Sequence, residues 1–126
     1  MTFEILPING ETWLICGGRD FSNAALFDDA MRDIVSQFGC PGRIVHGGAK
    51  GADTLANNWG VRLAIEVSPE PADWEKHGKA AGPIRNGAML SKHNPIRVVA
   101  FPGGRGTADM VRKAKAANIQ VIEIRI

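Results

Sequence analysis

The 126-residue chain has no tyrosine, only two cysteines and no hydrophobic run near the ~20 residues that a membrane span needs. Aromatic residues make up 6% of the chain, few for a protein that stacks single-stranded nucleic acid. Its charges almost balance, with 15 Lys and Arg against 13 Asp and Glu, whereas nucleic-acid-binding domains are usually more basic. We therefore expect no membrane span, and the composition argues against a nucleic-acid partner.

Motifs for metals and common cofactors are also missing. Cys16 and Cys40 match no metal-ligand spacing, and neither do the three histidines, so we expect no disulfide and no metal site. The chain lacks both the G-x-x-x-x-G-K-[ST] loop and the G-x-G-x-x-G fingerprint, which argues against a P-loop NTPase or an NAD-dependent dehydrogenase and predicts no cofactor. Residues 1–4 lack the basic segment of a signal peptide, so a cytoplasmic location is expected.

Short apolar runs alternate with amphipathic stretches. The runs predict strands at residues 12–16, 43–46, 64–67, 96–101 and 120–126. The stretches between them predict helices, one of them capped by Ser22 and another by Thr107. Residues 68–95 interrupt the alternation and can hold one or two short helices, near 75–80 and 83–91. This pattern predicts one α/β domain over residues 1–126, a three-layer Rossmann-like fold with a mostly parallel sheet of about five strands. Residues 1–11 form either an arm or an extra edge strand.

Glycine is abundant, with 15 residues, and about half of them follow predicted strands. With the strand order 3-2-1-4-5, three such loops share one edge of the sheet, at the crevice where open α/β sheets bind ligands. Glycine lets a phosphate approach the backbone, and each following helix adds positive potential at its N-terminus. Tight turns alone can explain any one loop, but three together favour an anionic, nucleotide-like ligand. The loop glycines are Gly17, Gly18, Gly47, Gly48, Gly51, Gly103, Gly104 and Gly106.

Several segments resemble a known superfamily. Residues 102–107 resemble the P-G-G-x-G-T-x-x-E motif of the LOG phosphoribohydrolases, and residues 85–89 resemble their R-K-x-x-M motif. From about residue 12 onward the chain is more similar to the YspA/YpsA-related branch of the SLOG (DprA–LOG) superfamily. The matching segments are CGGRDF (16–21), HGGAKGAD (46–53), ADW (72–74), GKAAGPIRN (78–86) and GGRGTADM (103–110).

This resemblance implies a Rossmann-like domain for nucleotides or nucleotide-derived ligands, with a homodimer as a possible assembly. It does not supply a settled reaction. The LOG motif would place its catalytic Glu at Met110, and its Lys after the Arg is Asn86 here. Methionine cannot supply a carboxylate, so whether the chain is an enzyme stays open.

Candidate ligand-binding residues lie in the matching segments. Arg85 is the first candidate, because a guanidinium can hold an oxyanion with two parallel hydrogen bonds. Asn86 can read a base or ribose, or cap a turn, and Thr107 can bind phosphate or only cap its helix. Arg19 and Arg105 lie within glycine-rich loops and should border the crevice. Trp74 can stack on a base, but the sequence favours a core position for it.

Three carboxylates are candidates for catalysis: Asp20, Asp53 and Asp109. Asp53 can instead be a helix N-cap, Asp20 can pair with Arg19, and Asp109 can provide favourable charge at a helix start. Three functions follow. The first is a nucleotide-binding domain, acting as a sensor or a processing enzyme. The second is N-glycosidic hydrolysis of nucleoside 5′-monophosphates, and the third is DprA-like binding of single-stranded DNA.

Overall fold

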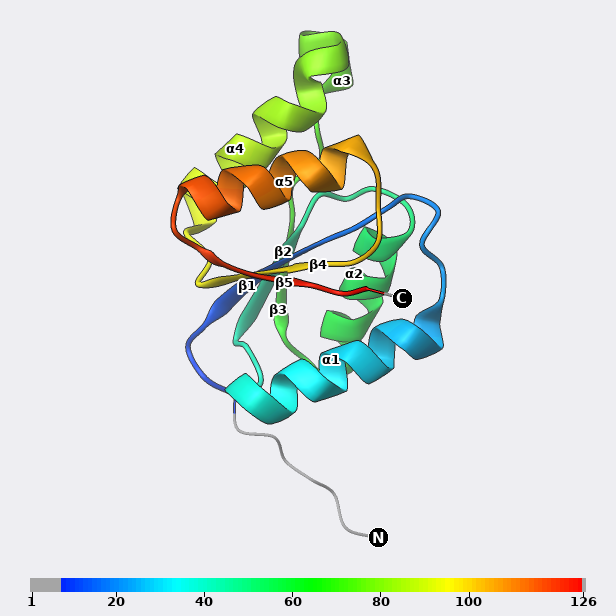
Figure 1. The fold of residues 1–126 in the computed structure, drawn as a ribbon, viewed down its shortest axis with the longest axis vertical. Helices are drawn as coiled ribbons and strands as arrows, with labels where there is room; N and C mark the ends of the chain where they lie inside the picture. The colour runs from blue at the N-terminus through cyan, green and yellow to red at the C-terminus, as the bar shows by residue number, and fades with distance from the viewer. Residues whose placement is uncertain (1–7, 126) are drawn as a thin grey trace, which may run out of the picture.

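The computed structural model describes residues 8–125, which form a five-stranded parallel sheet in the order β3-β2-β1-β4-β5. This confirms the predicted fold class, and the strand order is the one on which the shared edge of the three loops depends (Figure 1). The strands are β1 (Thr12–Cys16), β2 (Arg43–His46), β3 (Glu66–Pro69), β4 (Arg97–Ala100) and β5 (Gln120–Glu123). The helices are α1 (Ala24–Phe38), α2 (Ala52–Arg62), α3 (Trp74–His77), α4 (Ala81–His93) and α5 (Arg105–Ala116), with a 3-10 turn at Gly78–Ala80.

Helices cover both faces of the sheet, with α4 and α5 on one side and α1 and α2 on the other (Figure 1). Neighbouring residues of a strand point to opposite faces, so β1 serves both cores. Trp13 and Ile15 pack in the core under α1 and α2, whereas Leu14 packs in the core under α4 and α5. This double burial explains why the strands are short apolar runs without alternation.

Element boundaries differ from the predictions where single residues end or begin a helix. The third strand starts at Glu66 rather than residue 64, because Ala64 has a φ of +56° and closes the turn after α2. The side chain of Asn23, not Ser22, caps α1 by accepting a hydrogen bond from Leu26 N at 3.0 Å. The last strand ends at Glu123, so it is shorter than the predicted strand at residues 120–126.

The start of the described chain is anchored to the sheet rather than being a full edge strand. Ile8 forms a single parallel bridge with Cys40, and Asn9 N donates to Cys40 O at 2.8 Å. Glu11 accepts from the buried Arg97 at 2.8 Å. Residues 1–7, where the rest of the predicted arm falls, lie outside the described residues.

Candidate functional site

The three glycine-rich loops meet at the switch point of the sheet, where β1 lies between β2 and β4. The peptide groups of Gly18 join them. Gly18 N donates to Pro102 O at 2.8 Å, which ties the loop after β1 to the loop after β4. Gly18 O accepts from Ala52 N at 3.1 Å, which ties it to the start of α2. The shared edge predicted from the sequence is therefore held together by backbone hydrogen bonds.

Close packing of these loops explains much of the glycine content. A Cβ on Gly18 would lie 2.9 Å from Pro102 O. At Gly51, where φ is +78°, a Cβ would overlap Gly18 O and lie 2.5 Å from Arg19 O. By contrast, a Cβ on Gly104 or Gly106 would meet no other atom within 4 Å. Some loop glycines thus serve the contact between loops, and only those around α5 leave open space beside the backbone.

Two adjoining hollows lie at this edge, and together they are called the crevice here. The main hollow has a volume of about 480 Å³ and the side hollow about 390 Å³. They share Arg19, Gly47, Ala49, Trp74 and Arg85. A space of this size accommodates a small organic ligand.

The main hollow brings together most of the residues predicted for the site: Gly17, Gly18, Arg19, Gly47, Asp53, Arg85, Asn86, Gly104, Arg105, Gly106, Thr107 and Asp109. Gly48 lines the side hollow. Gly103 lies outside the crevice, and Asp20 is exposed and lines neither hollow.

Arg85 reaches from α4 across the loops after β2 and β3. Its Nη1 donates to Gly47 O at 2.6 Å and to Glu70 O at 3.3 Å, while its Nε donates to Asn86 Oδ1 at 3.1 Å. Burial lowers the pKa of Arg85, and the nearby Asp53 carboxylate opposes this shift. Among the described residues, no acceptor is recorded for Nη2. Nη1 and Nε of Arg85 thus brace the loops after β2 and β3 and the neighbouring Asn86, and the predicted clamp on an oxyanion remains a prediction.

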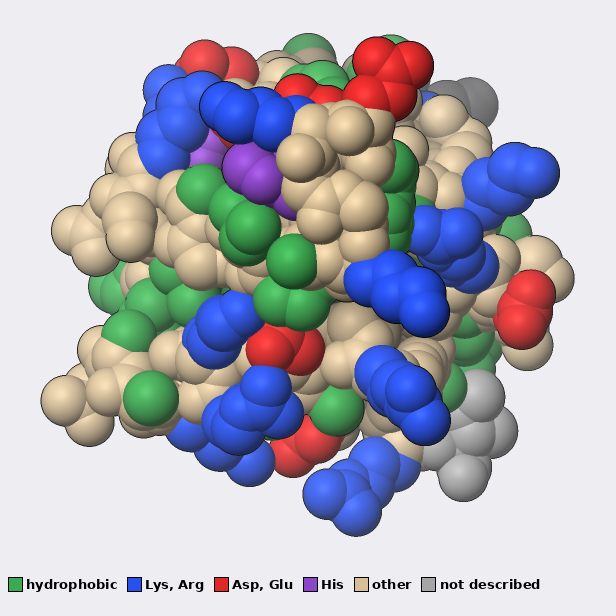
Figure 2. Space-filling view, turned by 90° about the horizontal axis from the view of Figure 1, so that it is seen from above, with side chains coloured by type: hydrophobic (Ala, Val, Ile, Leu, Met, Phe, Trp, Pro, Cys, Tyr) green, Lys and Arg blue, Asp and Glu red, His purple; other side chains and the backbone are tan. Residues whose placement is uncertain are grey.

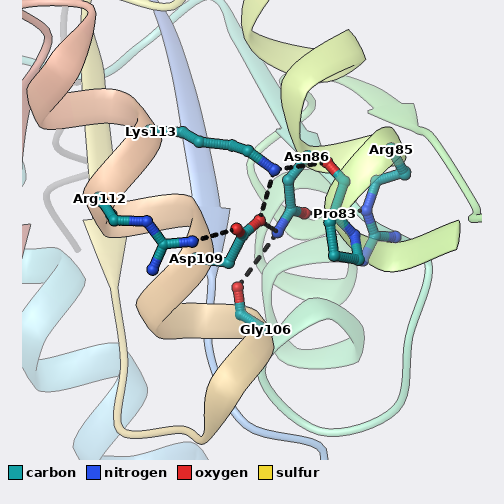
Figure 3. Close-up of polar contacts among 7 residues, drawn as sticks. All are labelled: Pro83, Arg85, Asn86, Gly106, Asp109, Arg112 and Lys113. Atoms are coloured by element: carbon teal, nitrogen blue, oxygen red, sulfur yellow. Dashed lines mark hydrogen bonds and ion pairs between the residues drawn. The ribbon is translucent and has the colours of Figure 1, made fainter. Parts of the chain in front are cut away.

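Asn86 and Asp109 form a polar network between α4 and the start of α5 (Figure 3). Asn86 Nδ2 donates to Asp109 Oδ2 at 3.0 Å and to Gly106 O at 3.1 Å. Asp109 also pairs with Arg112 at 2.6 Å and with Lys113 at 2.8 Å. Burial acts to raise the pKa of Asp109. Hydrogen bonds from Lys113 and Asn86, together with the positive charges of Lys113 and Arg112, outweigh burial, so the pKa is lowered overall. Both carboxylate oxygens are thus already bound by protein groups.

Replacing Asp109 by Asn should therefore destabilise the fold in a pH-dependent way. A carboxylate with a lowered pKa contributes stability above its ordinary pKa and loses it as the pH falls through the folded value. At pH 7, we expect Asp109→Asn to reduce the free energy of unfolding by roughly 1–3 kcal/mol, the scale of a charged hydrogen bond. The deficit should shrink below the ordinary value of 3.8. Urea unfolding at pH 7 and pH 3 measures this, and an equal deficit at both would contradict it.

Asp53 differs from Asp109 because it has no cationic partner at ion-pair distance among the described residues. It is buried in the first turn of α2, and its Oδ2 accepts from Ala49 N at 3.1 Å. Burial raises its pKa, and the hydrogen bond from Ala49 N together with nearby positive groups partly offsets the shift. The N-cap of α2 is Gly51 rather than Asp53. A buried carboxylate that lines a crevice without an ion pair is a common feature of functional sites.

Met110 and Cys16 supply no reactive group to the crevice. Met110 is buried with Leu14, Met89 and Val98 in the core under α4 and α5, so the position of the LOG glutamate faces the core here. Burial raises the pKa of the Cys16 thiol to about 12, so it stays protonated and is a poor nucleophile at neutral pH.

Three further side chains at the crevice bear on the sequence predictions. Trp74 was expected in the core but is 50% exposed and lines both hollows. Thr107 is not the cap, which was one of its two predicted roles, because α5 begins at Arg105 after Gly104; Thr107 lies in the first turn at the rim of the main hollow. Lys79 also lines the main hollow. Both Trp74 and Lys79 lie in segments that resemble the SLOG family, ADW (72–74) and GKAAGPIRN (78–86). Those two matches were the features of the sequence that could have indicated a place at the crevice.

Positive charge without a partner is concentrated at the crevice. Nine of the 15 Lys and Arg side chains form ion pairs with described residues. The six for which no ion pair with a described residue is found are Arg19, Lys50, Lys76, Lys79, Arg85 and Arg105. All of these except Lys76 line the main or the side hollow. Figure 2, which views the molecule from the side of α3, shows several Lys and Arg side chains close together with isolated carboxylates between them. The crevice therefore carries an excess of positive charge.

A parallel 3-2-1-4-5 sheet with a crevice at its switch point defines a Rossmann-like domain, a fold in which ligands generally bind at that crevice. The model of the YspA, cpYpsA-related SLOG family (YAcAr) matches residues 14–77. The chain is also 40% identical over 116 residues to the Gene 61 protein of Mycobacterium phage D29, covering 86% of this chain and 92% of that protein. The chain belongs to the YspA, cpYpsA-related SLOG family, and this membership suggests a nucleotide-related ligand.

Residues 8–125 lack two features. No helix in this range is both long and apolar enough to cross a membrane. The same residues contain no group of three or more His, Cys, Asp or Glu side chains that could hold a metal ion.

Proposed function

We propose that the crevice binds a nucleotide or nucleotide-derived ligand through its phosphate groups. The observation that carries this proposal is the unpaired charge: five of the six cations without an ion pair to a described residue line the two hollows. The main hollow is lined by two carboxylates, Asp53 and Asp109. Asp109 is already paired with Arg112 and Lys113, so Asp53 is left to oppose the unpaired positive charges. Such an excess suits a ligand with two or more negative charges, as a nucleotide has.

The parts of the crevice suggest different roles. The first backbone N–H groups of α5 have no partner within the helix, and the helix dipole favours an anion at this end. Gly104 and Gly106 leave space beside this backbone, and Arg105 lies between them. We assign the phosphate to this end. The carboxylate of Asp53 has no ion pair with a described residue and would accept hydrogen bonds from ribose hydroxyls, while Nη2 of Arg85, which has no acceptor among residues 8–125, would donate to the ligand.

Removing one crevice cation should weaken nucleotide binding more than removing an equally exposed cation elsewhere. We expect Arg105→Ala to lose roughly tenfold or more in affinity, the scale of one charge-assisted hydrogen bond. Lys76→Ala is the matched control, because Lys76 also has no ion pair with a described residue but lines neither hollow. Isothermal titration with the four nucleoside 5′-monophosphates, at low and high salt, measures both variants.

The proposal fails if none of these nucleotides binds, or if Arg105→Ala and Lys76→Ala bind with equal affinity. Salt-sensitive retention of single-stranded DNA without any response to mononucleotides would favour the DprA-like alternative instead.

Hydrolysis of the N-glycosidic bond is a second candidate function, favoured by the unpaired carboxylate of Asp53. Such a carboxylate can stabilise the positive charge that develops on the sugar as the N-glycosidic bond breaks and its electron pair leaves with the base. Water then adds its oxygen to the sugar carbon, and a proton from this water ends on the departing base. Chromatography of nucleoside monophosphates incubated with the protein would detect released base. Release that is lost in Asp53→Asn and retained in Asp20→Asn supports an enzyme, whereas binding without release supports a sensor.

A further inference from the structure

Trp74 has an unusual environment for a tryptophan of this protein. Trp13 and Trp59 are 0% and 6% exposed and pack in the core between the sheet and α1 and α2. Trp74, the first residue of α3, is 50% exposed. Leaving a large aromatic ring in water forfeits the free energy of its burial, so the core does not account for this residue.

The ring of Trp74 lies where the two hollows join. It lines both of them, together with Arg19 and Arg85. Asp73 caps α3, the helix that carries the ring, by accepting a hydrogen bond from Lys76 N at 3.0 Å. The far edge of the indole lies beside Gly82 of α4, where a Cβ would come within 3.6 Å of it.

Arg19 lies over this ring, with its guanidinium carbon 5.7 Å from the ring centroid. This distance is within the range of a cation–π interaction, which shows that the ring presents a π face to the crevice. Arg19 is exposed and has no ion pair with a described residue, so it can move from the ring to a phosphate at little cost.

We propose that Trp74 is the stacking platform for the base of the bound nucleotide. This inference rests on the proposed nucleotide-binding function and adds a base subsite to it. In this arrangement the phosphate lies at the start of α5 and the base lies on the indole across the crevice. Arg19 can contact either the phosphate or the base. Stacking tolerates different bases because each has a π face, so this subsite selects nucleotides over base-free sugar phosphates.

The experiment compares a ligand with a base and one without. AMP and ribose 5-phosphate are titrated into the full chain, with heat and tryptophan fluorescence as readouts. Because the other two tryptophans are buried, quenching by AMP reports on Trp74. We expect Trp74→Leu to weaken AMP binding roughly tenfold to a hundredfold, to abolish the quenching and to leave ribose 5-phosphate binding unchanged. Trp74→Phe should retain part of the AMP affinity.

Ile84→Ala is the matched control, because Ile84 is 47% exposed and lies on α4 outside both hollows; it should bind AMP as the unmodified chain does. Equal AMP affinity in Trp74→Leu and the unmodified chain overturns the base subsite alone. Equal losses of AMP and ribose 5-phosphate in Trp74→Leu also overturn it, because they indicate a structural role. If neither AMP nor the other three monophosphates bind the unmodified chain, the proposed function fails as well.

Discussion

Arg85→Ala is expected to weaken nucleotide binding by roughly a hundredfold and to lower the free energy of unfolding by about 2 kcal/mol. The first effect follows from losing a partly buried positive charge whose Nη2 is free for a ligand. The second follows because Gly47 O and Glu70 O lose their donor, and an unsatisfied buried polar group costs ~1–3 kcal/mol. Titration calorimetry and urea unfolding measure the two effects separately.

Lys92→Ala is a matched control for Arg85→Ala. Lys92 lies on the same helix and also contacts Glu70, through its carboxylate at 2.7 Å, but it lines neither hollow. Its loss should cost ~1 kcal/mol or less, as for other exposed ion pairs, and leave ligand affinity unchanged. Arg85→Ala would contradict the assignment if, at a temperature where circular dichroism shows it folded, it bound nucleotides within twofold of the unmodified chain.

Gly51→Ala is expected to destabilise the protein by about 3 kcal/mol or more. Its φ of +78° strains any residue with a Cβ, and the added methyl would overlap the carbonyl of Gly18. Since Gly18 also bonds Pro102 and Ala52, the displacement would reach all three loops. Nucleotide binding should therefore fall together with the free energy of unfolding, as measured by urea titration.

Gly106→Ala tests whether this effect is specific. Gly106 lies in α5, and a Cβ there would meet no atom within 4 Å. Alanine favours a helix over glycine by roughly 0.5–1 kcal/mol, so stability should stay equal or rise. A loss of more than about 1 kcal/mol in Gly106→Ala, or none in Gly51→Ala, would show that the packing of the loops has been misassigned.

The fold was predictable because its signals are local and repeated. Gly17 and Gly47 directly follow the apolar runs of β1 and β2. The amphipathic pattern between the two runs indicates a helix that connects them as a crossover. Right-handed crossovers then restrict the strand order. Boundaries set by one residue, such as the positive φ of Ala64 or the cap at Asn23, were not predictable, because similar residues nearby could serve equally well.

The gathering of the predicted residues around one crevice was also predictable, but the contacts of each side chain were not. The carboxylates illustrate the difference. Asp109 and Asp53 both border the crevice as expected, yet Asp109 is bound by Arg112 and Lys113 while Asp53 has only backbone donors. The ion pairs of Asp109 join residues three and four positions apart in α5, so helical spacing is compatible with them. By contrast, the hydrogen bond from Asn86 of α4 and the backbone donors of Asp53 depend on tertiary packing, which sequence spacing does not reveal. The exposure of Trp74 likewise depends on how the irregular segment after β3 folds back over the crevice.

Backbone amide chemical-shift mapping with AMP tests most directly the central claim that the crevice binds a nucleotide anion. The account predicts saturable shifts at Gly17–Arg19, Gly47–Lys50 and Gly104–Thr107, together with the indole N–H of Trp74. The apolar groove between α1 and α2, which is lined by Met31, Val35 and Trp59, should stay unchanged. Shifts confined to that groove, or no saturable shift with any of the four nucleoside monophosphates, would contradict the account.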